Sequence, residues 1–483
     1  MKSYISWNKI LVGALLGLII YSCTKDITGD YLENQPPETD IFIKSTPSDT
    51  LNPTKSVQTI FWDGRDPDGF VKGFFYTWAE LPDSNDWIWT TKRSMVFPLV
   101  ITGQDTSYVF QVKAVDNQDL QDQTPALQLF PIRNSAPAIS WTPSSLIPDT
   151  TFTVASFLWS ASDLDGDATI THFEYAIDDT SSWRKTPGFN RSISLNADSG
   201  IVEGEHIFFI RAVDIAGSRS KTIRMPEDRT WFAKNPRGRY LLIDDFQNEA
   251  NSGFPDAYYK SMLNTILAEI GTGERFDYWN IEEQFPASRL QFTETMKLFE
   301  RIIWYTDLIQ ESDQHFITAQ VAIPEYLNYE KSGDINRKLI YTVQFNQGFG
   351  TQGSPLEFSP VDSLGSTYKY ITTGSRYYPE PDSISDFYSV FGKTLPELKV
   401  SKIVLGLAAL KPKVNSIPLY RYDDPKMDED PLFVLLGKND LKAQFDPEIA
   451  YDFVFSGTPM HFLNGNDNLN DFFRIIFKDV FKP

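Results

Sequence analysis

Short segments in which apolar and polar residues alternate fill the first half of the chain. One series lies between residues 40 and 134, and a second occupies residues 135–232. Alternation with a period of two is typical of half-buried strands. Proline, glycine, asparagine and aspartate separate the segments, so each series predicts an all-β sandwich. In the first series the alternating segments are 41–43, 57–62, 71–78 and 108–115.

The two series repeat one another at their best-marked points. Each has a tryptophan on its second strand, an Asp-x-Asp-Gly turn after that strand, and a closing strand that ends in aspartate. The matched positions are Trp62 and Trp159, the turns Asp66-Pro67-Asp68-Gly69 and Asp163-Leu164-Asp165-Gly166, and the strand ends Asp116 and Asp214. The sequence therefore predicts two similar domains in tandem, and the tryptophans are expected in the cores between their sheets.

The repeated pattern resembles that of fibronectin type III domains, which have an Ig-like sandwich fold. The core tryptophans, Tyr76 and Tyr175 on the following strand, and the alternation in the closing strands carry the resemblance. The resemblance implies a tyrosine corner at Tyr108, and the second copy has His206 at that place.

The hydrophobic period changes after residue 232. Short apolar segments then alternate with longer segments whose apolar residues recur at helical spacing, which predicts a three-layer α/β domain with a mostly parallel sheet over residues 233–483. Between 346 and 399 the pattern dissolves into glycine, serine, proline and tyrosine, which predicts an insertion or long loop. Strands are expected at 239–246, 276–281, 301–305, 338–345, 402–409, 433–437 and 452–455, and helices at 255–270, 290–299, 315–329 and 469–481.

The amino-terminal segment has the features of an export signal. Lys2 and Lys9 precede or border an apolar stretch, residues 10–21, that is too short to span a bilayer. Ser22 then precedes the single cysteine of the chain, Cys23. This order resembles a bacterial lipoprotein signal, in which the cysteine receives a diacylglyceryl group and an acyl chain such as palmitate. The alternative is an ordinary secretory signal with an incidental cysteine.

The lipoprotein resemblance implies that residues 1–22 are a signal peptide and that Cys23 becomes a lipidated amino terminus. Residues 23–39 are polar and have no apolar period, so they are expected to form a tether. Several acyl chains on one residue give stable attachment. The protein is therefore expected outside the cytoplasm, anchored in a membrane by its lipid, at the outer membrane or the cell surface.

Charge and cysteine content exclude several classes of function. The 44 basic and 64 acidic residues give a net charge of −20, which repels phosphate backbones, so nucleic acid is excluded as a partner. Because the only cysteine lies in the export segment, the folded body has no disulfide, thiolate metal cluster or cysteine nucleophile. The four histidines show no His-x-x-x-His spacing of the kind that zinc sites use.

The repeated Asp-x-Asp-Gly turns offer oxygen ligands. Calcium takes about six to eight oxygens from a flexible loop, and such a turn supplies two carboxylates and a carbonyl. Aspartate and glycine are also the residues that tight turns select, so turn capping explains the same pattern. No cofactor other than this calcium is expected. Its candidate ligands are Asp66, Asp68, Asp116, Asp163, Asp165, Asp167 and Asp214.

The carboxyl-terminal domain resembles the class I glutamine amidotransferase-like and flavodoxin-like families in its layout. The strand at 241–245, which ends in two aspartates, and the strand and acid at 302–307 carry this resemblance. An active amidotransferase implies a cysteine on the turn at 346–350 and a late His-x-Glu pair. The turn has no cysteine, and His461 has no acid two positions later. The resemblance therefore implies a descendant that binds without catalysing.

Open α/β sheets bind ligands at the carboxyl ends of their strands. We expect a ligand pocket there, lined by Asp244, Asp245, Thr306, Asp307, Gly348 and Gly350. Three functions stay open. The favoured one is a lipid-anchored cell-envelope module that binds or presents an envelope protein or glycan. The alternatives are an extracytoplasmic metal-dependent hydrolase that uses the strand-end carboxylates, and a structural component of an envelope or secretion assembly.

Overall fold

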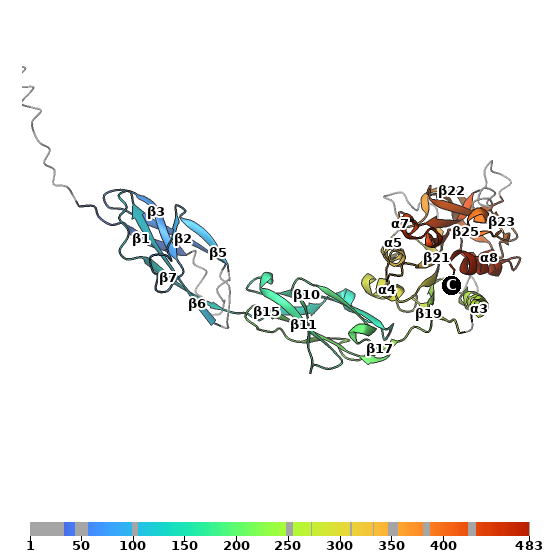
Figure 1. Cartoon of the computed structure of the whole chain (residues 1–483), viewed down its shortest axis with the longest axis horizontal. Coiled ribbons are helices and arrows are strands. Elements are labelled where there is room, and N and C mark those ends of the chain that lie inside the picture. The colour runs from blue at the N-terminus through green and yellow to red at the C-terminus, as the bar shows by residue number, and fades with distance from the viewer. Residues whose placement is uncertain are drawn as a thin grey trace, which may run out of the picture. The chain divides into compact units, whose positions relative to one another are not determined.

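The chain divides into two compact units, Met1–Ser135 and Ala136–Pro483, which are drawn in Figure 1. The predicted lipidation site Cys23 and the two pocket glycines, Gly348 and Gly350, lie outside the described residues. The computed structural model describes residues 33–43, 57–98, 105–247, 255–271, 273–309, 312–331, 333–345, 356–379, 387–423 and 431–482.

The first unit contains a sandwich of two antiparallel sheets. One sheet has the strand order β1-β2-β5, and the other has the order β4-β3-β6-β7. Three strands facing four in this order form a fibronectin type III-like sandwich, as predicted. The strands are β1 (Glu38–Ile43), β2 (Val57–Arg65), β3 (Val71–Thr77), β4 (Ile88–Thr90), β5 (Ser94–Pro98), β6 (Asp105–Asp116) and β7 (Ala126–Arg133).

Trp62 lies at the centre of this sandwich. Alternation along β2 turns Trp62 inward, where it is 1% exposed, and turns Phe61 outward, where it is 41% exposed. The ring of Trp62 lies 5.6 Å from that of Phe110 and 6.2 Å from that of Tyr76, measured between centroids. The predicted core role of Trp62 is confirmed.

The second unit begins with a sandwich of the same strand order. Its sheets are β13-β10-β8 and β12-β11-β15-β16, and a short third sheet, β14-β17-β9, is added. The elements are β8 (Ala138–Trp141), η1 (Pro143–Ser145), β9 (Thr150–Phe152), β10 (Val154–Ser162), η2 (Asp167–Thr169), β11 (Ile170–Ile177), β12 (Arg184–Pro187), β13 (Ser192–Asn196), η3 (Ala197–Ser199), β14 (Gly204–His206), β15 (Phe208–Asp214), β16 (Ile223–Met225) and β17 (Trp231–Lys234).

Trp159 occupies the place in this second core that Trp62 has in the first. It is 1% exposed, and its ring lies 5.2 Å from that of Phe173. His206 is buried as well, and its Nε2 lies 2.7 Å from the carbonyl oxygen of Val202, four residues upstream. The imidazole therefore bonds back to its own chain at the position where the first copy has Tyr108.

An 11-stranded sheet forms the rest of the second unit. Five of its strands, in the order β19-β18-β20-β21-β28, pair in parallel. The elements are β18 (Tyr240–Asp245), α3 (Pro255–Ile270), β19 (Phe276–Asn280), α4 (Arg289–Met296), β20 (Arg301–Ile309), α5 (Gln314–Leu327), β21 (Lys338–Phe345), β22 (Val361–Ile371), β23 (Arg376–Pro379), β24 (Leu398–Lys399), β25 (Val404–Pro412), β26 (Ser416–Tyr422), β27 (Leu432–Lys438), α7 (Asp440–Phe445), η4 (Pro447–Ile449), β28 (Tyr451–Ser456), η5 (Met460–Leu463), α8 (Leu469–Ile475) and η6 (Ile476–Val480).

One prediction for this sheet is wrong, and the segment predicted as an insertion or long loop contains strands. The sheet is not mostly parallel, because β27 runs antiparallel to β28 and the pairs among β22 to β27 are antiparallel too. The segment 346–399 is not only a loop, because β22, β23 and β24 lie within it. Most of β22 is partly or fully exposed, so its side chains show no clear apolar alternation, and main-chain pairing with β25 makes it a strand.

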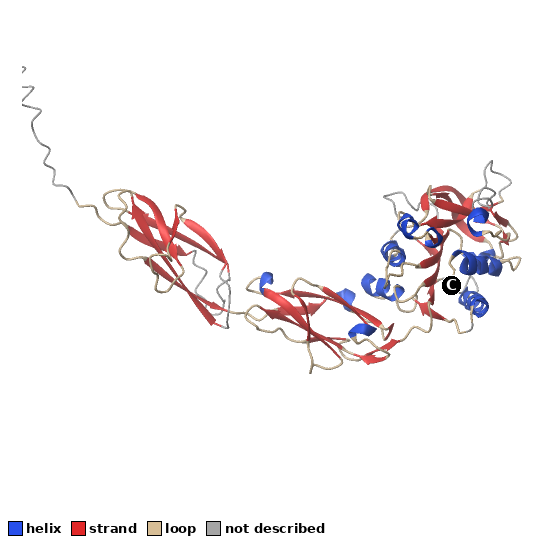
Figure 2. Cartoon of the chain, viewed as in Figure 1, coloured by secondary structure: helices blue, strands red, loops and turns tan. Residues whose placement is uncertain are grey.

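Helices cover both faces of the parallel part of the sheet (Figure 2). Tyr259 and Leu263 of α3, with Phe473 of α8, pack on one face. Phe292 of α4 and Phe316 of α5 pack on the other. Among the described residues, no helix has the length and apolar character needed to cross a membrane.

The second sandwich packs against the α/β part through Phe152, although each has a hydrophobic cluster of its own. Phe152 of β9 packs in the cluster under α4 and α5, with its ring 5.0 Å from that of Phe299. The side chain of Gln291, on α4, bonds to β10 through both its amide atoms: Oε1 accepts from the N–H of Ser156 at 2.7 Å, and Nε2 donates to the carbonyl of Val154 at 3.0 Å.

Candidate functional site

The chain reverses its direction of travel across the sheet at β18. From β18 it passes through α3 to β19 on one side, and from β19 it passes through α4 to β20 on the other side. Open α/β sheets bind ligands outside the carboxyl ends of the strands at such a switch point. At that edge Asp244 and Asp245 of β18 lie beside Tyr305 and Thr306 of β20.

The two aspartates at the end of β18 do not share a site. Successive residues of a strand point to opposite faces of the sheet. Oδ2 of Asp244 accepts a hydrogen bond from the hydroxyl of Tyr278 at 2.5 Å, on the face that α3 covers. Oδ2 of Asp245 accepts from Nε1 of Trp304 at 2.9 Å, on the face of α4 and α5. The expectation that Asp244 and Asp245 line one common pocket is therefore wrong.

Thr306 and Asp307 lie at this edge, as expected from the sequence, and are 2% and 7% exposed. Asp307 lies within a register shift of β20, between Tyr305 and Leu308. The shift separates its position from the regular alternation of the strand.

Asp245 instead meets Glu282 and His315, which the sequence did not single out. Nδ1 of His315 lies 2.5 Å from Oδ1 of Asp245 and 3.4 Å from Oε1 of Glu282. The ligand-capable atoms of the three residues lie within 4.8 Å of one another, and no other such group of three occurs in the described part of the chain. Glu282 follows β19 and His315 opens α5, so both stand just after a strand at the carboxyl edge. That position was the signal available in the sequence.

The surrounding side chains fix the orientation of this group. Trp304 holds the second oxygen of Asp245, which is 2% exposed. The ring of Phe285 stacks on the imidazole of His315, with centroids 4.0 Å apart and planes at 10°. Asp313, the N-cap of α5, accepts from the N–H of His315 at 2.9 Å. The three side chains are thus preorganised before any ligand arrives.

Burial and mutual attraction change the proton affinities of the group. Burial raises the pKa of the Asp245 carboxyl, against the opposing effect of its bonds from His315 and Trp304. Burial by itself lowers the pKa of His315, but the hydrogen bond to Asp245 and the negative charges of Asp245 and Glu282 outweigh it and raise that pKa. His315 therefore carries a proton at neutral pH when no other cation lies between the carboxylates.

His461 lies on the other face of the sheet from Asp245. It packs in the core cluster of the opposite face, with its ring 5.1 Å from Phe246 and 5.8 Å from Tyr259. Neither ring nitrogen bonds to a described residue, and burial lowers the pKa of His461 to about 3. A neutral imidazole among aromatic rings gives no sign of acid–base work.

The aspartates predicted to bind calcium hold their own turns. Oδ1 of Asp116 accepts from the N–H groups of Gln118 and Leu120, each at 2.8 Å. In the second copy Oδ1 of Asp163 accepts from the N–H of Asp165 at 2.9 Å. Asp66, Asp167 and Asp214 also accept main-chain N–H groups at their turns, whereas Asp68 accepts from the N–H of Gln35. These bonds account for turn capping, and calcium binding stays a prediction.

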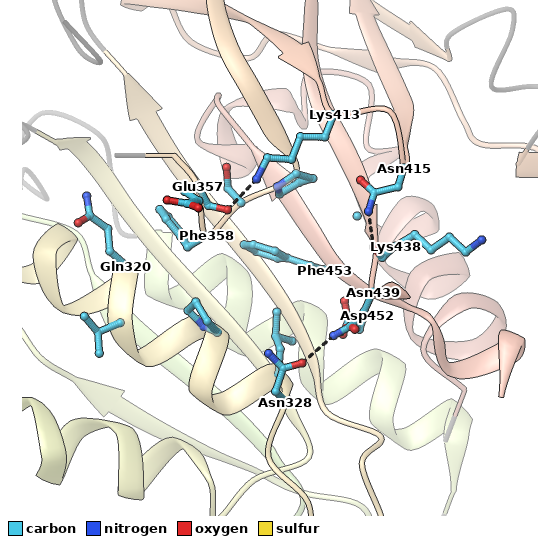
Figure 3. Close-up of a pocket in the computed structure, with 16 residues that line it drawn as sticks. Gln320, Asn328, Glu357, Phe358, Lys413, Asn415, Lys438, Asn439, Asp452 and Phe453 are labelled. Carbon is cyan, nitrogen blue, oxygen red and sulfur yellow. Dashed lines mark hydrogen bonds between the residues drawn. The ribbon is translucent and has the colours of Figure 1, made fainter. Parts of the chain in front are cut away.

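A separate cavity of about 650 Å³ lies at the other end of the sheet, beside the start of β28 (Figure 3). Several of its polar side chains bond to one another or to the main chain. Nδ2 of Asn439 donates to Oδ1 of Asn328 at 3.0 Å and to Oδ2 of Asp452 at 3.1 Å, and Nζ of Lys413 donates to the carbonyl of Glu357 at 2.6 Å. Because these donors already have acceptors, the cavity is a weaker candidate than the Asp245 group.

Comparison with known proteins adds little to this geometry. No family model and no curated protein matches the chain. Solved structures that resemble part of it include the fibronectin(III)-like modules of Clostridium thermocellum CbhA, with 15% identity, 41% of this chain and 95% of that chain covered, and a TM-score of 0.17. A two-domain fibronectin type III segment of chicken tenascin has 14% identity, coverages of 39% and 97%, and a TM-score of 0.21.

The PKD1 domain of the Vibrio cholerae metalloprotease PrtV has 12% identity, coverages of 20% and 99%, and a TM-score of 0.15. The neighbours are thus fibronectin III-like and PKD domains at low identity. Their TM-scores are too low to support an argument, so the assignment of the two sandwiches depends on their strand order.

Proposed function

We propose that this chain is a lipid-anchored cell-envelope protein in which two sandwich domains carry an α/β domain that binds an envelope protein or glycan. The binding site is the carboxyl edge of β18 and β20. The observation that carries this proposal is the pair formed by the buried Asp245 and the half-buried His315 at the switch point. Burying charges costs several kcal/mol even when they are paired, and here the cost falls at the edge where such sheets bind ligands.

The absence of a cysteine nucleophile supports binding rather than amidotransfer. The sequence has no cysteine after Cys23. The signal-like residues before Cys23 support the lipid anchor, and the net charge of −20 favours a partner other than nucleic acid.

Membrane fractionation tests the anchor. Cys23→Ser should release the protein from membranes while its folded domains stay intact, because the thiol is the proposed attachment point. The fractions are compared with the wild type by blotting, and the length of the product is checked by mass spectrometry. A processed Cys23→Ser protein that still sediments with membranes would exclude the lipid anchor.

Capture experiments test the binding site. The purified chain is presented to envelope glycans and to solubilised envelope proteins, and its bound partners are identified by mass spectrometry. His315→Gln should reduce capture of a specific partner at least tenfold, since it removes the cation beside Asp245. The matched control is Glu283→Gln, an exposed carboxylate beside Glu282. Equal capture by wild type and His315→Gln would leave the carboxyl edge without a binding role and favour a structural component.

One observation favours the metal-dependent hydrolase as a second candidate. Asp245, Glu282 and His315 bring three ligand-capable atoms within 4.8 Å of one another. A bound metal with an open position can activate water. Turnover of an envelope substrate that depends on added metal would select this alternative.

A further inference from the structure

Glu282 has a buried oxygen without a donor. Oε1 of Glu282 is enclosed and accepts no hydrogen bond from any described residue. It lies 3.4 Å from Nδ1 of His315, which is already 2.5 Å from Oδ1 of Asp245. An imidazole carries a single N–H at Nδ1, so it satisfies one of the two carboxylates. A buried acceptor left unsatisfied costs about 1–3 kcal/mol, and more when it is charged.

A divalent cation at this point satisfies all three groups at once. Zinc binds histidine nitrogen and carboxylate oxygen at about 2.0–2.2 Å, so two ligands of one ion lie at most roughly 4.4 Å apart. The three ligand-capable atoms here lie within 4.8 Å of one another. Small side-chain rotations therefore suffice to bring them onto one ion.

We propose that Asp245, Glu282 and His315 bind one divalent transition-metal ion of the zinc class. An imidazole with two carboxylates suits zinc and related first-row ions, whereas magnesium and calcium prefer oxygen ligands alone. Three protein ligands leave a coordination position for water or for a group of the partner. The proposal deepens the proposed function, because it names the chemistry at the same carboxyl edge.

Neighbouring residues contact the proposed ligands and restrict their orientation. Trp304 Nε1 bonds to Oδ2 of Asp245 at 2.9 Å and leaves Oδ1 directed at His315. Phe285 stacks on the imidazole at 4.0 Å and restricts its rotation. Such outer contacts usually change metal affinity by about 10–100-fold.

Metal uptake by the purified full chain tests the proposal. The protein is stripped with a chelator, dialysed against Zn²⁺ or Co²⁺, and analysed by elemental mass spectrometry and by the visible absorption of Co²⁺. The wild type should retain about one equivalent, and its Co²⁺ spectrum should show nitrogen and oxygen ligands. His315→Gln and Glu282→Gln should bind at least tenfold more weakly, and the control Glu283→Gln should match the wild type.

Near-UV circular dichroism establishes that each variant is folded. If His315→Gln disturbs the stack on Phe285, Glu282→Gln is the second variant that tests the metal site. The side chain of Glu282 is 23% exposed, so its replacement disturbs the packing less. Absence of stoichiometric uptake by the wild type, or equal uptake by all four proteins, would overturn the metal site.

The same preparations separate this proposal from the proposed function. If zinc binds at these residues and partner capture ignores both the chelator and His315→Gln, the metal site stands and the partner site fails. If capture depends on His315 but no metal binds, the partner site stands and the metal site fails.

Discussion

Replacing Gln291 tests whether the second sandwich and the α/β part unfold as one body. β8 pairs with β10 from Trp159 to Ser162, so the edge of β10 before Trp159 lacks this partner strand. Gln291 covers that edge with one acceptor bond and one donor bond to Ser156 and Val154, at 2.7 and 3.0 Å. Gln291→Met keeps the length of the side chain and removes both bonds.

The expected cost follows from the groups that lose their partners. The Ser156 N–H and the Val154 carbonyl stay buried under α4, since Ser156 is 3% exposed and Val154 is 2% exposed. Each unsatisfied main-chain group costs about 1–3 kcal/mol. The sum is about 2–6 kcal/mol, which is a large share of the stability of a domain.

Hydrogen exchange of the full chain gives the sharpest measurement. In the wild type the amide of Ser156 should exchange as slowly as the core of the sandwich. In Gln291→Met the free energy of its opening should fall by about 2–6 kcal/mol, which is roughly 30-fold faster exchange or more. Arg289→Met, at an exposed position of the same helix, is the control. Unchanged protection of the segment 154–158 would refute a stabilising role for this contact.

Three further substitutions test the cores and the charge network. Trp62→Ala should lower the stability of the first unit by ~3–5 kcal/mol, and Trp159→Ala should lower that of the second by the same amount. Each effect is measured from the denaturant midpoint of the affected unit. An unaltered midpoint would contradict the core assignment. Arg474 and Lys478 hold the pKa of Glu269 down to about 2. The stabilisation of the folded state by this ion pair is present above about pH 4.5 and disappears as the pH falls through 2. Glu269→Gln should therefore flatten the acid-unfolding curve in that window, by less than ~1 kcal/mol because the pair is a third exposed.

Local sequence determined the elements in which each face is either buried or exposed along its whole length. The repeated alternation around Trp62 and Trp159 predicted both sandwiches, because inward and outward positions of a strand differ in polarity. The helix predicted at 255–270 is α3 (Pro255–Ile270) with the same bounds, since one face is continuously apolar and Gly271 follows its end.

Tertiary structure decided the direction of the strands and the membership of the site. Strand direction depends on which neighbour supplies main-chain bonds, so the sequence did not reveal β22 or the antiparallel direction of the strands beside it. Asp245 ends β18, Glu282 follows β19 and His315 lies in the first turn of α5. The sequence pointed to Asp245 but gave no reason to group it with Glu282 and His315. They meet because the carboxyl ends of parallel strands share an edge, while the pleat of β18 sends Asp244, the immediate neighbour of Asp245, to the other face.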